Sequence, residues 1–472
     1  MRDIDHIYID GAFIKPHGTE RLPLVNPTTE EVIGHVVLAD KEDTQQAIAA
    51  AKHAWPAFSR TSKAQRVAML ERLHAAVISR AEELRNATIE EYGGPVSRAA
   101  WVSQFAAQAF LDAARTLETY EFERRAGAAT LVMEPVGVSV LITPWNSNAG
   151  SICSKLAMAI AAGCTTVIKP SEMSAIQTQI VAEAFHEADL PPGVVNIING
   201  RGDVVGTELS TNPDVARISF TGSTGTGKII ARQALDTMKR VSLALGGKSP
   251  TILLEDADFE KAVPAALNIA FQNNGQACIA GSRLLVPQKR LGQVVELAKS
   301  AVAGMRVGNP ADPATTIGPM ANRSQFDRVQ SYIRRGVEQG ATLVAGGEGR
   351  PQGLNRGYFV KPTVFVNVSN DMAIAQEEIF GPVLCIIIYR DEDEAVAVAN
   401  DSAFGLHAYV FSSNTQNAQA IARRLQAGRV AINGMQHDPL APFGGFKQSG
   451  VGREFGLFGL ESFLEAKTIM AA

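Results

Sequence analysis

The feature that most constrains the fold is an alternation of short β-branched runs with helix-like stretches between residues 137 and 247. The runs end in turns and read "GVSVLITPW", "TTVIKP", "VVNIING", "ARISFTG" and "RVSLALGG". Helix-like stretches such as "SICSKLAMAIAAG" and "SAIQTQIVAEAFHEA" separate them. Near-continuous apolar strands that alternate with helices predict a parallel sheet with helices on both of its faces.

The rest of the chain adds further units around this sheet. Because strand–helix–strand crossovers are right-handed, the region from 137 to 247 is predicted to form a Rossmann-type half. A second alternating unit runs from residue 246 to about 435. The N-terminal third is expected to be largely helical, since apolar residues recur there at three- and four-residue spacing. A chain of 472 residues exceeds one hydrophobic core, which predicts two or three domains.

Two apolar, alternating stretches lie far apart in the sequence, "ATLVMEPVGVSV" near residue 130 and "FGLESFLEAKTIM" near the end. Together they predict a small appended sheet. One edge of such a sheet is free to pair with another subunit.

Composition argues against several classes of function. A net charge of −4 leaves no basic surplus for binding nucleic acid or a membrane surface. No apolar run approaches the ~20 residues that span a bilayer, and the first residues lack the apolar core of a signal peptide. The four cysteines show neither paired nor metal-ligand spacing, which indicates reduced thiols, a cytoplasmic location and no metal site.

Two turns carry groups that suit a nucleotide. "FTGSTGTGK" (220–228) opens a helix, and its glycines let backbone N–H groups approach a phosphate. Its spacing matches neither the Walker loop nor G-x-G-x-x-G, so a plain turn is an equal alternative. In "IKPSE" (168–172) a Lys and a Glu suit ribose hydroxyls. The alternative is a helix start capped by Ser171 or Ser174, with Glu172 in its first turn.

Two other stretches carry groups that suit covalent catalysis. In "FQNNGQACIAGSR" (271–283) small neighbours leave room for a substrate to reach the sulfur of Cys278. A lone Cys is more often a small buried hydrophobic residue. In "LITPWNSN" (141–148) the amide of Asn146 is placed to donate to a developing oxyanion, although an Asn-stabilised turn explains it equally simply.

Taken in order along nearly the whole chain, these stretches resemble the NAD(P)-dependent aldehyde dehydrogenase superfamily. Two further motifs match it, "EEIFGPV" (377–383) and "PFGGFKQSGVGRE" (442–454). The resemblance implies an α/β fold with a Rossmann-type cofactor domain, an α/β catalytic domain and a small β oligomerisation appendage, assembled as a homodimer or homotetramer. The implied ranges are 1–118 and 141–245 for the NAD-binding domain, 246–440 for the catalytic domain, and 119–140 with 456–472 for the oligomerisation strands.

The resemblance also assigns roles to residues. Cys278 matches the nucleophile, which forms a thiohemiacetal and then a thioester with an aldehyde. Asn146 matches the oxyanion donor, acting with the backbone N–H of Cys278. NAD is the expected cofactor rather than NADP, because Glu172 would repel a 2′-phosphate. The implied cofactor-binding residues are Ile142, Thr143, Pro144, Trp145, Lys169, Ser171, Glu172, Gly202, Phe220, Gly222, Ser223, Leu245, Glu378 and Phe380.

One position departs from the family pattern. In the family "ELGGKSP" supplies a Glu as general base, whereas this chain reads "ALGGKSP" with Ala244 at that position. Hydrolysis of a thioester without that base is slower by ~10²–10⁴-fold. A CoA-acylating branch naturally lacks the Glu, but it departs from "LGGKSP" and from the residues around the cysteine. We therefore favour a deliberate Glu-to-Ala change in a hydrolytic enzyme. A non-catalytic nucleotide-binding member is a further alternative.

The resemblance places the substrate tunnel by position. Its expected lining is mainly apolar and aromatic: Trp101, Phe105, Ser147, Ile279, Met435, His437 and Phe443. Each of these could instead be ordinary core. The set holds no Arg or Lys that would bind a carboxylate, which favours an aliphatic or aromatic aldehyde over a semialdehyde acid.

Overall fold

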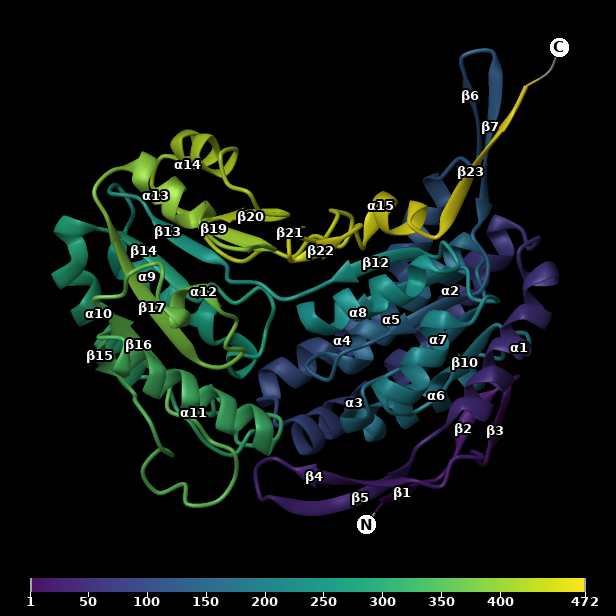
Figure 1. Ribbon diagram of the computed structural model, residues 1–472, viewed down its shortest axis with the longest axis horizontal. Coiled ribbons are helices and arrows are strands. Elements are labelled where there is room, and N and C mark those ends of the chain that lie inside the picture. Colours follow the sequence, from purple (N-terminus) through teal and green to yellow (C-terminus); the bar gives the residue numbers. More distant parts are fainter. Residues whose placement is uncertain (1, 471–472) are drawn as a thin grey trace.

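The computed structural model describes residues 2–470, which form two α/β units side by side and a narrow sheet that projects from one of them (Figure 1). The first unit contains an eight-stranded sheet with the order β22-β12-β11-β8-β9-β10-β2-β3. Its central strands β8 to β12 are parallel to one another. The strands are β2 (Ile7–Ile9), β3 (Ala12–Ile14), β8 (Ser139–Ile142), β9 (Thr166–Lys169), β10 (Val195–Ile197), β11 (Arg217–Thr221), β12 (Arg240–Ala244) and β22 (Gly450–Val451).

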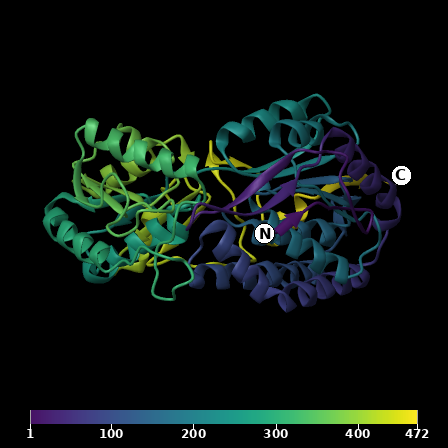
Figure 2. The same ribbon diagram turned by 90° about the horizontal axis from the view of Figure 1, so that it is seen from below.

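Helices cover both faces of this sheet, as the alternation in the sequence predicts (Figure 2). On one face Leu70, Phe110 and Leu156 share a core with the sheet, and on the other Ile48 and Ile230 do so. The helices are α1 (Lys41–Phe58), α2 (Lys63–Ser79), α3 (Ala81–Ala87), α4 (Val96–Thr119), α5 (Asn148–Ala162), α6 (Ala175–Glu187), α7 (Thr207–Thr211) and α8 (Thr224–Leu235).

The N-terminal third is less helical than the sequence predicts. Five strands precede the first helix, and three of them form a sheet with the order β1-β5-β4. These are β1 (Arg2–Ile4), β4 (Arg21–Asn26) and β5 (Glu31–Val37). Only a few of their side chains are buried, so the apolar alternation that marks a strand is weak there.

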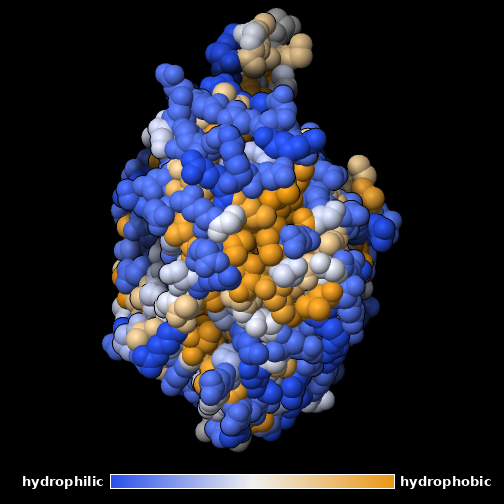
Figure 3. Space-filling view, turned by 90° about the vertical axis from the view of Figure 1, so that its left-hand side faces the viewer, coloured by the Kyte–Doolittle hydropathy of each residue, from blue (hydrophilic) through white to orange (hydrophobic). Residues whose placement is uncertain are grey.

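The second unit contains a seven-stranded sheet with the order β15-β16-β17-β14-β13-β19-β20. Apolar side chains gather near the centre of its outer end face, surrounded by hydrophilic ones (Figure 3). The strands are β13 (Pro250–Leu253), β14 (Arg283–Pro287), β15 (Thr342–Ala345), β16 (Thr363–Val366), β17 (Val383–Tyr389), β19 (His407–Phe411) and β20 (Arg429–Ile432). The helices are α9 (Phe259–Phe271), α10 (Leu291–Ala303), α11 (Arg323–Glu338), α12 (Ala373–Gln376), α13 (Glu392–Asn400) and α14 (Thr415–Ala422).

The two stretches that the sequence assigns to an appended sheet pair with each other. Strand β7 (Ala129–Pro135) lies between β6 (Glu123–Ala126) and β23 (Leu464–Ile469), and both pairings are antiparallel. A short helix, α15 (Gly456–Glu461), precedes β23. Residues 471–472 of the predicted oligomerisation segment lie outside the described residues. No helix within residues 2–470 is long and apolar enough to cross a membrane.

Ser449 joins the two units where β12 ends. Its carbonyl oxygen accepts a hydrogen bond from the backbone N–H of Leu245 at 3.0 Å. Its hydroxyl donates to the carbonyl of Gly246 at 2.7 Å and accepts from the backbone N–H of Gly405 at 2.9 Å. The turn after Ala244 is therefore held by residues from both units.

Candidate active site

The parallel strands of the first unit end at one edge of the sheet, and most of the predicted groups lie along that edge. Ala244 ends β12, Gly222 follows β11, and Thr143 follows β8. Lys169 ends β9, which is the next strand along. Ligands of open α/β sheets bind outside the carboxyl ends of the strands, so this edge is where a nucleotide site is expected.

The turn after Ala244 makes close contact with the second unit through two glycines. A Cβ atom added at Gly246 would lie 2.2 Å from the Glu378 carboxylate, and one at Gly247 would lie 2.5 Å from the carbonyl oxygen of Cys278. The backbone N–H of Gly247 also donates to the Glu378 carboxylate at 3.1 Å. Only glycine lets the backbone approach both groups this closely.

Cys278 lies in a loop after α9 that takes an unusual backbone path. Asn273 and Asn274 both adopt left-handed conformations, with φ of 52° and 61°. The side-chain amide of Asn273 donates to the carbonyl of Asn146 at 3.0 Å, and the amide of Asn146 donates to the carbonyl of Gln276 at 2.9 Å. These bonds hold Asn146 against the cysteine loop. Cys278 is partly exposed, whereas the other three cysteines are buried.

A cavity of about 340 Å³ lies between the two units at this point. It brings together all three predicted catalytic positions and half of the predicted cofactor residues. Its lining is Pro144, Trp145, Asn146, Thr221, Gly222, Ser223, Ala244, Leu245, Gly246, Cys278, Gln325, Arg328, Glu378 and Phe380. The ring of Trp145 meets that of Phe380 edge to face, with centroids 5.4 Å apart.

The other predicted cofactor residues lie outside this cavity, at or next to the ends of neighbouring strands. They are Ile142, Thr143, Lys169, Ser171, Glu172, Gly202 and Phe220. Lys169 is buried and pairs with the partly exposed carboxylate of Glu172 at 3.2 Å. Burial lowers the pKa of the Lys169 ammonium, and the charge of Glu172 opposes that effect. Ser171 caps the turn by accepting from the backbone N–H of Met173 at 3.4 Å, which confirms the helix-start interpretation of "IKPSE" with Ser171 as the cap.

At the helix start in "FTGSTGTGK", Ser223 caps α8 by accepting a hydrogen bond from the backbone N–H of Thr226 at 3.2 Å. A Cβ atom at Gly222 would lie 2.5 Å from the ring of Phe220, whereas one at Gly225 would meet no atom within 4 Å. The first turn of α8 thus opens onto free space beside the cavity, which leaves room for an anion at the helix N-terminus.

Two residues of α11 complete the cavity and were not predicted from the sequence. Gln325 donates to the carbonyl of Phe380 at 2.6 Å, and Arg328 donates to the carbonyl of Glu378 at 2.5 Å. They hold the segment in which Phe380 adopts a left-handed conformation with φ of 62°. No motif marks them, because they act on a segment about fifty residues further along the chain.

Burial shifts the pKa values of two titratable groups in the cavity, Cys278 and Glu378. It raises the pKa of the Cys278 thiol to about 12, with the nearby charge of Glu378 as a second cause. It also raises the pKa of the Glu378 carboxyl to about 7, against the hydrogen bond from Gly247. The thiol is therefore protonated at neutral pH in the unliganded protein.

Glu454 is the other carboxylate near Cys278, but it is already paired. It forms an ion pair with the buried Lys155, whose ammonium also donates to the hydroxyl of Ser219 at 2.9 Å. Glu454 does not line the 340 Å³ cavity, whereas Glu378 does. Of these two carboxylates, only Glu378 faces the space beside Ala244.

Several residues of the predicted substrate tunnel form an aromatic rim near Cys278. Trp101 and Phe105 stack with centroids 5.0 Å apart, and His437 contacts both rings edge to face. Phe443 joins the rim through Phe455, a residue that the sequence prediction omits. Ser147 precedes α5, Ile279 follows Cys278, and Met435 is half exposed near His437.

A cation lies next to the predicted tunnel lining, although the predicted set itself contains none. The guanidinium of Arg98 lies over the ring of Trp101, with its carbon 4.4 Å from the ring centroid. Arg98 precedes Trp101 by one helical turn on α4. The prediction considered only the aromatic positions of this helix and left Arg98 out.

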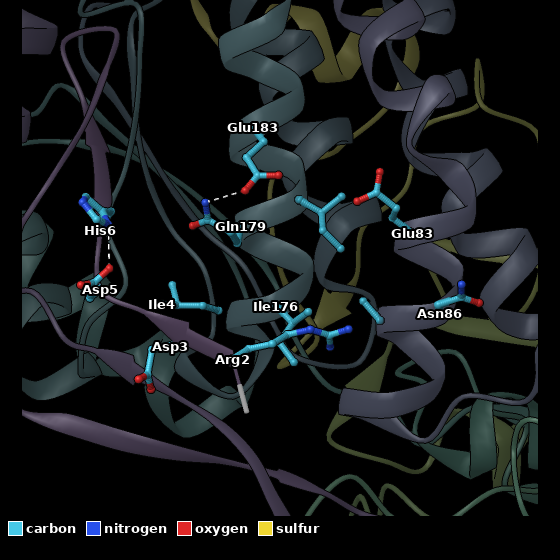
Figure 4. A pocket seen from close by; sticks show the side chains of 12 residues that line it. Arg2, Asp3, Ile4, Asp5, His6, Glu83, Asn86, Ile176, Gln179 and Glu183 are labelled. Carbon is cyan, nitrogen blue, oxygen red and sulfur yellow. Dashed lines mark hydrogen bonds and ion pairs between the residues drawn. The ribbon is translucent and has the colours of Figure 1, made fainter.

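A larger cavity, of about 540 Å³, lies on the N-terminal side between β1, α3 and α6 (Figure 4). Charged side chains of both signs line it, among them Arg2, Asp5 and Glu183. None of the predicted site residues lies there. Its size does not make it the better site, because it lacks a nucleophile and does not adjoin the strand ends.

Comparisons with known proteins agree with the motifs. The sequence model of the "Aldehyde dehydrogenase family" matches residues 13–469. A 3-succinoylsemialdehyde-pyridine dehydrogenase from a Pseudomonas species is 46% identical over 472 residues, which cover 100% of this chain and 99% of that protein.

Solved structures share the fold. A cysteine-to-alanine mutant of aldehyde dehydrogenase C from Pseudomonas syringae, in complex with NAD⁺ and octanal, is 45% identical with a TM-score of 0.97, covering 99% of this chain and 96% of that one. The betaine aldehyde dehydrogenase of Staphylococcus aureus in complex with NAD⁺ is 35% identical with a TM-score of 0.96, covering 98% of this chain and 94% of that one.

The raised pKa of Cys278 predicts a characteristic pH dependence of alkylation. Only the thiolate reacts, so the rate of iodoacetamide labelling in the unliganded protein should rise about tenfold per pH unit from pH 7 to pH 10. A free thiol with a pKa of about 8.5 should instead level off above pH 9. Peptide mapping identifies the labelled cysteine, and Cys278→Ala serves as the control. A plateau near pH 8 would contradict the raised pKa of Cys278. Labelling of a different cysteine first would contradict the assignment of Cys278 as the reactive thiol.

Proposed function

The chain belongs to the aldehyde dehydrogenase family, and from this premise we propose that it oxidises an aldehyde to a carboxylic acid with NAD through a thioester on Cys278. The observation that carries the proposal is the cavity shared by Cys278, Asn146 and the turn at Gly222 and Ser223. A nucleophile, an oxyanion donor and an anion-binding helix start are the groups that this reaction requires.

The chemistry begins at Cys278: its thiol loses a proton to solvent, and the resulting thiolate attacks the aldehyde carbon. The amide of Asn146 and the backbone N–H of Cys278 donate to the resulting oxyanion, which lowers the barrier to attack. NAD, when bound, supplies the hydride acceptor. The residues present fit it: the open N-terminal turn of α8 suits the pyrophosphate, and the Lys169–Glu172 pair suits a ribose. Cys278 is left with a thioester, which water must hydrolyse.

Hydrolysis is the step that Ala244 affects. Its methyl group lines the cavity that Cys278 lines and offers no proton acceptor. The nearest alternative is Glu378, whose pKa of about 7 suits a general base but whose carboxylate is engaged by Gly247. We infer that the chain as given completes the first half of the reaction and deacylates slowly.

The substrate is proposed to carry an aliphatic or aromatic body. The rim of Trp101, Phe105 and His437 supports this, since aromatic faces bind such groups well. The names of two relatives agree, because one was crystallised with octanal and the other acts on a pyridine-bearing semialdehyde.

Restoring the carboxylate tests the role of Ala244. Ala244→Glu should raise steady NADH production by a factor on the order of 10² or more, as expected when a general base is returned. Ala244→Gln has nearly the same shape as Ala244→Glu but no base, and it should leave the rate of NADH production low.

Added CoA should not accelerate NADH production by the unsubstituted chain. Strong stimulation by CoA would instead assign the chain to a CoA-acylating reaction, for which an alanine at this position is natural. NAD binding without NADH formation in any variant would indicate a non-catalytic member.

The choice of cofactor follows from the position of Glu172. Its carboxylate should accept from the ribose 2′-hydroxyl of NAD and repel the 2′-phosphate of NADP. NAD should bind more tightly by calorimetry, and Glu172→Gln should narrow the difference. Glu187→Gln, at the far end of α6, provides the matched control. Equal or tighter binding of NADP to the unsubstituted chain would overturn the preference.

Assembly is proposed to use the projecting sheet and the apolar surface near its base. Strands β6 and β23 are its two edges, and Val451, Leu457 and Phe458 are exposed close to α15. Sedimentation should find a homodimer or homotetramer at micromolar concentration. Truncation after Glu465 spares the buried Leu460 and Phe463 and should weaken the assembly while the thermal unfolding midpoint of the subunit stays similar. A full-length chain that sediments as a monomer would refute this proposal.

A further inference from the structure

Arg98 lies where the aromatic rim meets the cysteine loop. Its guanidinium packs on the face of Trp101, and its Nε donates to the side-chain carbonyl of Asn273 at 3.2 Å. Asn273 in turn donates to the carbonyl of Asn146. Two independent contacts therefore fix the plane of the guanidinium beside the groups that surround Cys278.

The remaining donors of Arg98 are uncommitted. Within residues 2–470, its two Nη atoms make no hydrogen bond or ion pair with the protein, although burial lowers its pKa. Arg98 is partly buried, and three arginines that are more fully buried use their Nη atoms in hydrogen bonds to the protein itself. Arg66 donates to the carbonyl of Ala162 at 2.9 Å, Arg217 to the hydroxyl of Ser242 at 2.7 Å, and Arg283 to the carbonyl of Ala399 at 2.7 Å.

The second arginine of the rim shows the same contrast. Arg429 packs on Phe443 and Phe455, but its Nε and Nη2 are bound to the backbone carbonyls of residues 438, 441 and 442. Arg429 therefore holds the loop, and most of its donors are already bound to the protein rather than free for a ligand. Among the rim cations in the described part of the chain, Arg98 is the one whose two Nη atoms both lack a protein hydrogen-bond partner.

A planar fork with free Nη groups matches an oxygen acceptor, and a carboxylate matches it best because both of its oxygens can be bound at once. Asn273, which accepts from Arg98, also donates to the carbonyl of Gln276 at 3.0 Å, and Gln276 precedes Cys278 by two residues, so Arg98 lies beside the cysteine loop. A purely apolar aldehyde would exclude water from the Nη groups without offering them an acceptor, which costs free energy.

We propose that Arg98 is a specificity-determining residue that binds an oxygen acceptor, a carboxylate or a ketone, carried by the substrate away from its aldehyde carbon. This inference rests on the proposed function and narrows its substrate class. The favoured substrates are then semialdehyde acids or keto aldehydes, rather than aldehydes with no second oxygen-containing group.

Matched pairs of aldehydes test the inference, with the burst of NADH from the chain as it exists as the readout. One pair is hexanal and 6-oxohexanoate, which tests the carboxylate. The other is 4-phenylbutanal and 4-oxo-4-phenylbutanal, which tests the ketone. The burst rate constant divided by the apparent dissociation constant of the aldehyde should be about 10- to 100-fold larger for at least one oxygen-bearing partner than for its plain counterpart. A hydrogen bond to a charged group provides a difference of this size.

Substitution of Arg98 should remove that preference. In Arg98→Gln the preferred oxygen-bearing aldehyde should lose about 10- to 100-fold, while the plain partner should change by less than about threefold. Arg98→Lys should keep part of the preference for the carboxylate. Arg115→Gln, on the exposed far end of α4, should change neither substrate.

The outcomes separate the possible failures. A loss of equal size for both members of a pair would mean that Arg98 only holds Asn273, and it would overturn the inference. The absence of any preference in the unsubstituted chain would also overturn it, even if the variants did not fold. The absence of an NADH burst with every aldehyde would refute the proposed function itself.

Discussion

The structure depends on how closely the turn after β12 approaches the second unit. Gly247 lies against the carbonyl of Cys278 and Gly246 lies against the carboxylate of Glu378, so no larger residue fits at either position without a shift. Ser449 holds the same turn with three hydrogen bonds that reach both units. The edge of the nucleotide-type sheet is thereby fixed beside the cysteine loop. Each of the proposed roles in the cavity requires that these two units meet there.

This close approach also explains the electrostatics of the cavity. Desolvation raises the pKa values of both Cys278 and Glu378, so the thiol is protonated at neutral pH while the carboxyl is about half ionised. A carboxylate in place of Ala244 would supply a base within the same cavity. With alanine there, the cavity retains its nucleophile and oxyanion donor but has no uncommitted base among the residues that line it. The two halves of the proposed reaction therefore depend on different residues and can be separated.

Much of the fold and part of the site could be predicted from the sequence, for physical reasons that can be named. The sheet was predictable because its central strands are buried on both faces and are continuously apolar, whereas β4 and β5 are mostly only partly buried and gave no clear signal. Cys278, Asn146 and the strand-end turns lie in local motifs. Gln325 and Arg328 do not, because they hold the segment around Phe380 only through tertiary contacts. Arg98 was missed because its unfilled donors and its contact with Trp101 are visible only in three dimensions.

The central claim is that Cys278 accepts an acyl group and that Ala244 leaves it there. The most direct measurement mixes the chain with NAD and an aldehyde, records NADH formation by stopped flow, and weighs the intact protein at the end of the burst. The account predicts about one NADH per subunit and an acyl adduct that maps to Cys278. Rapid, sustained NADH production with no adduct would show that another group, with Glu378 the first to test, serves as the base. A burst accompanied by an adduct on any other residue would contradict the assignment of the nucleophile.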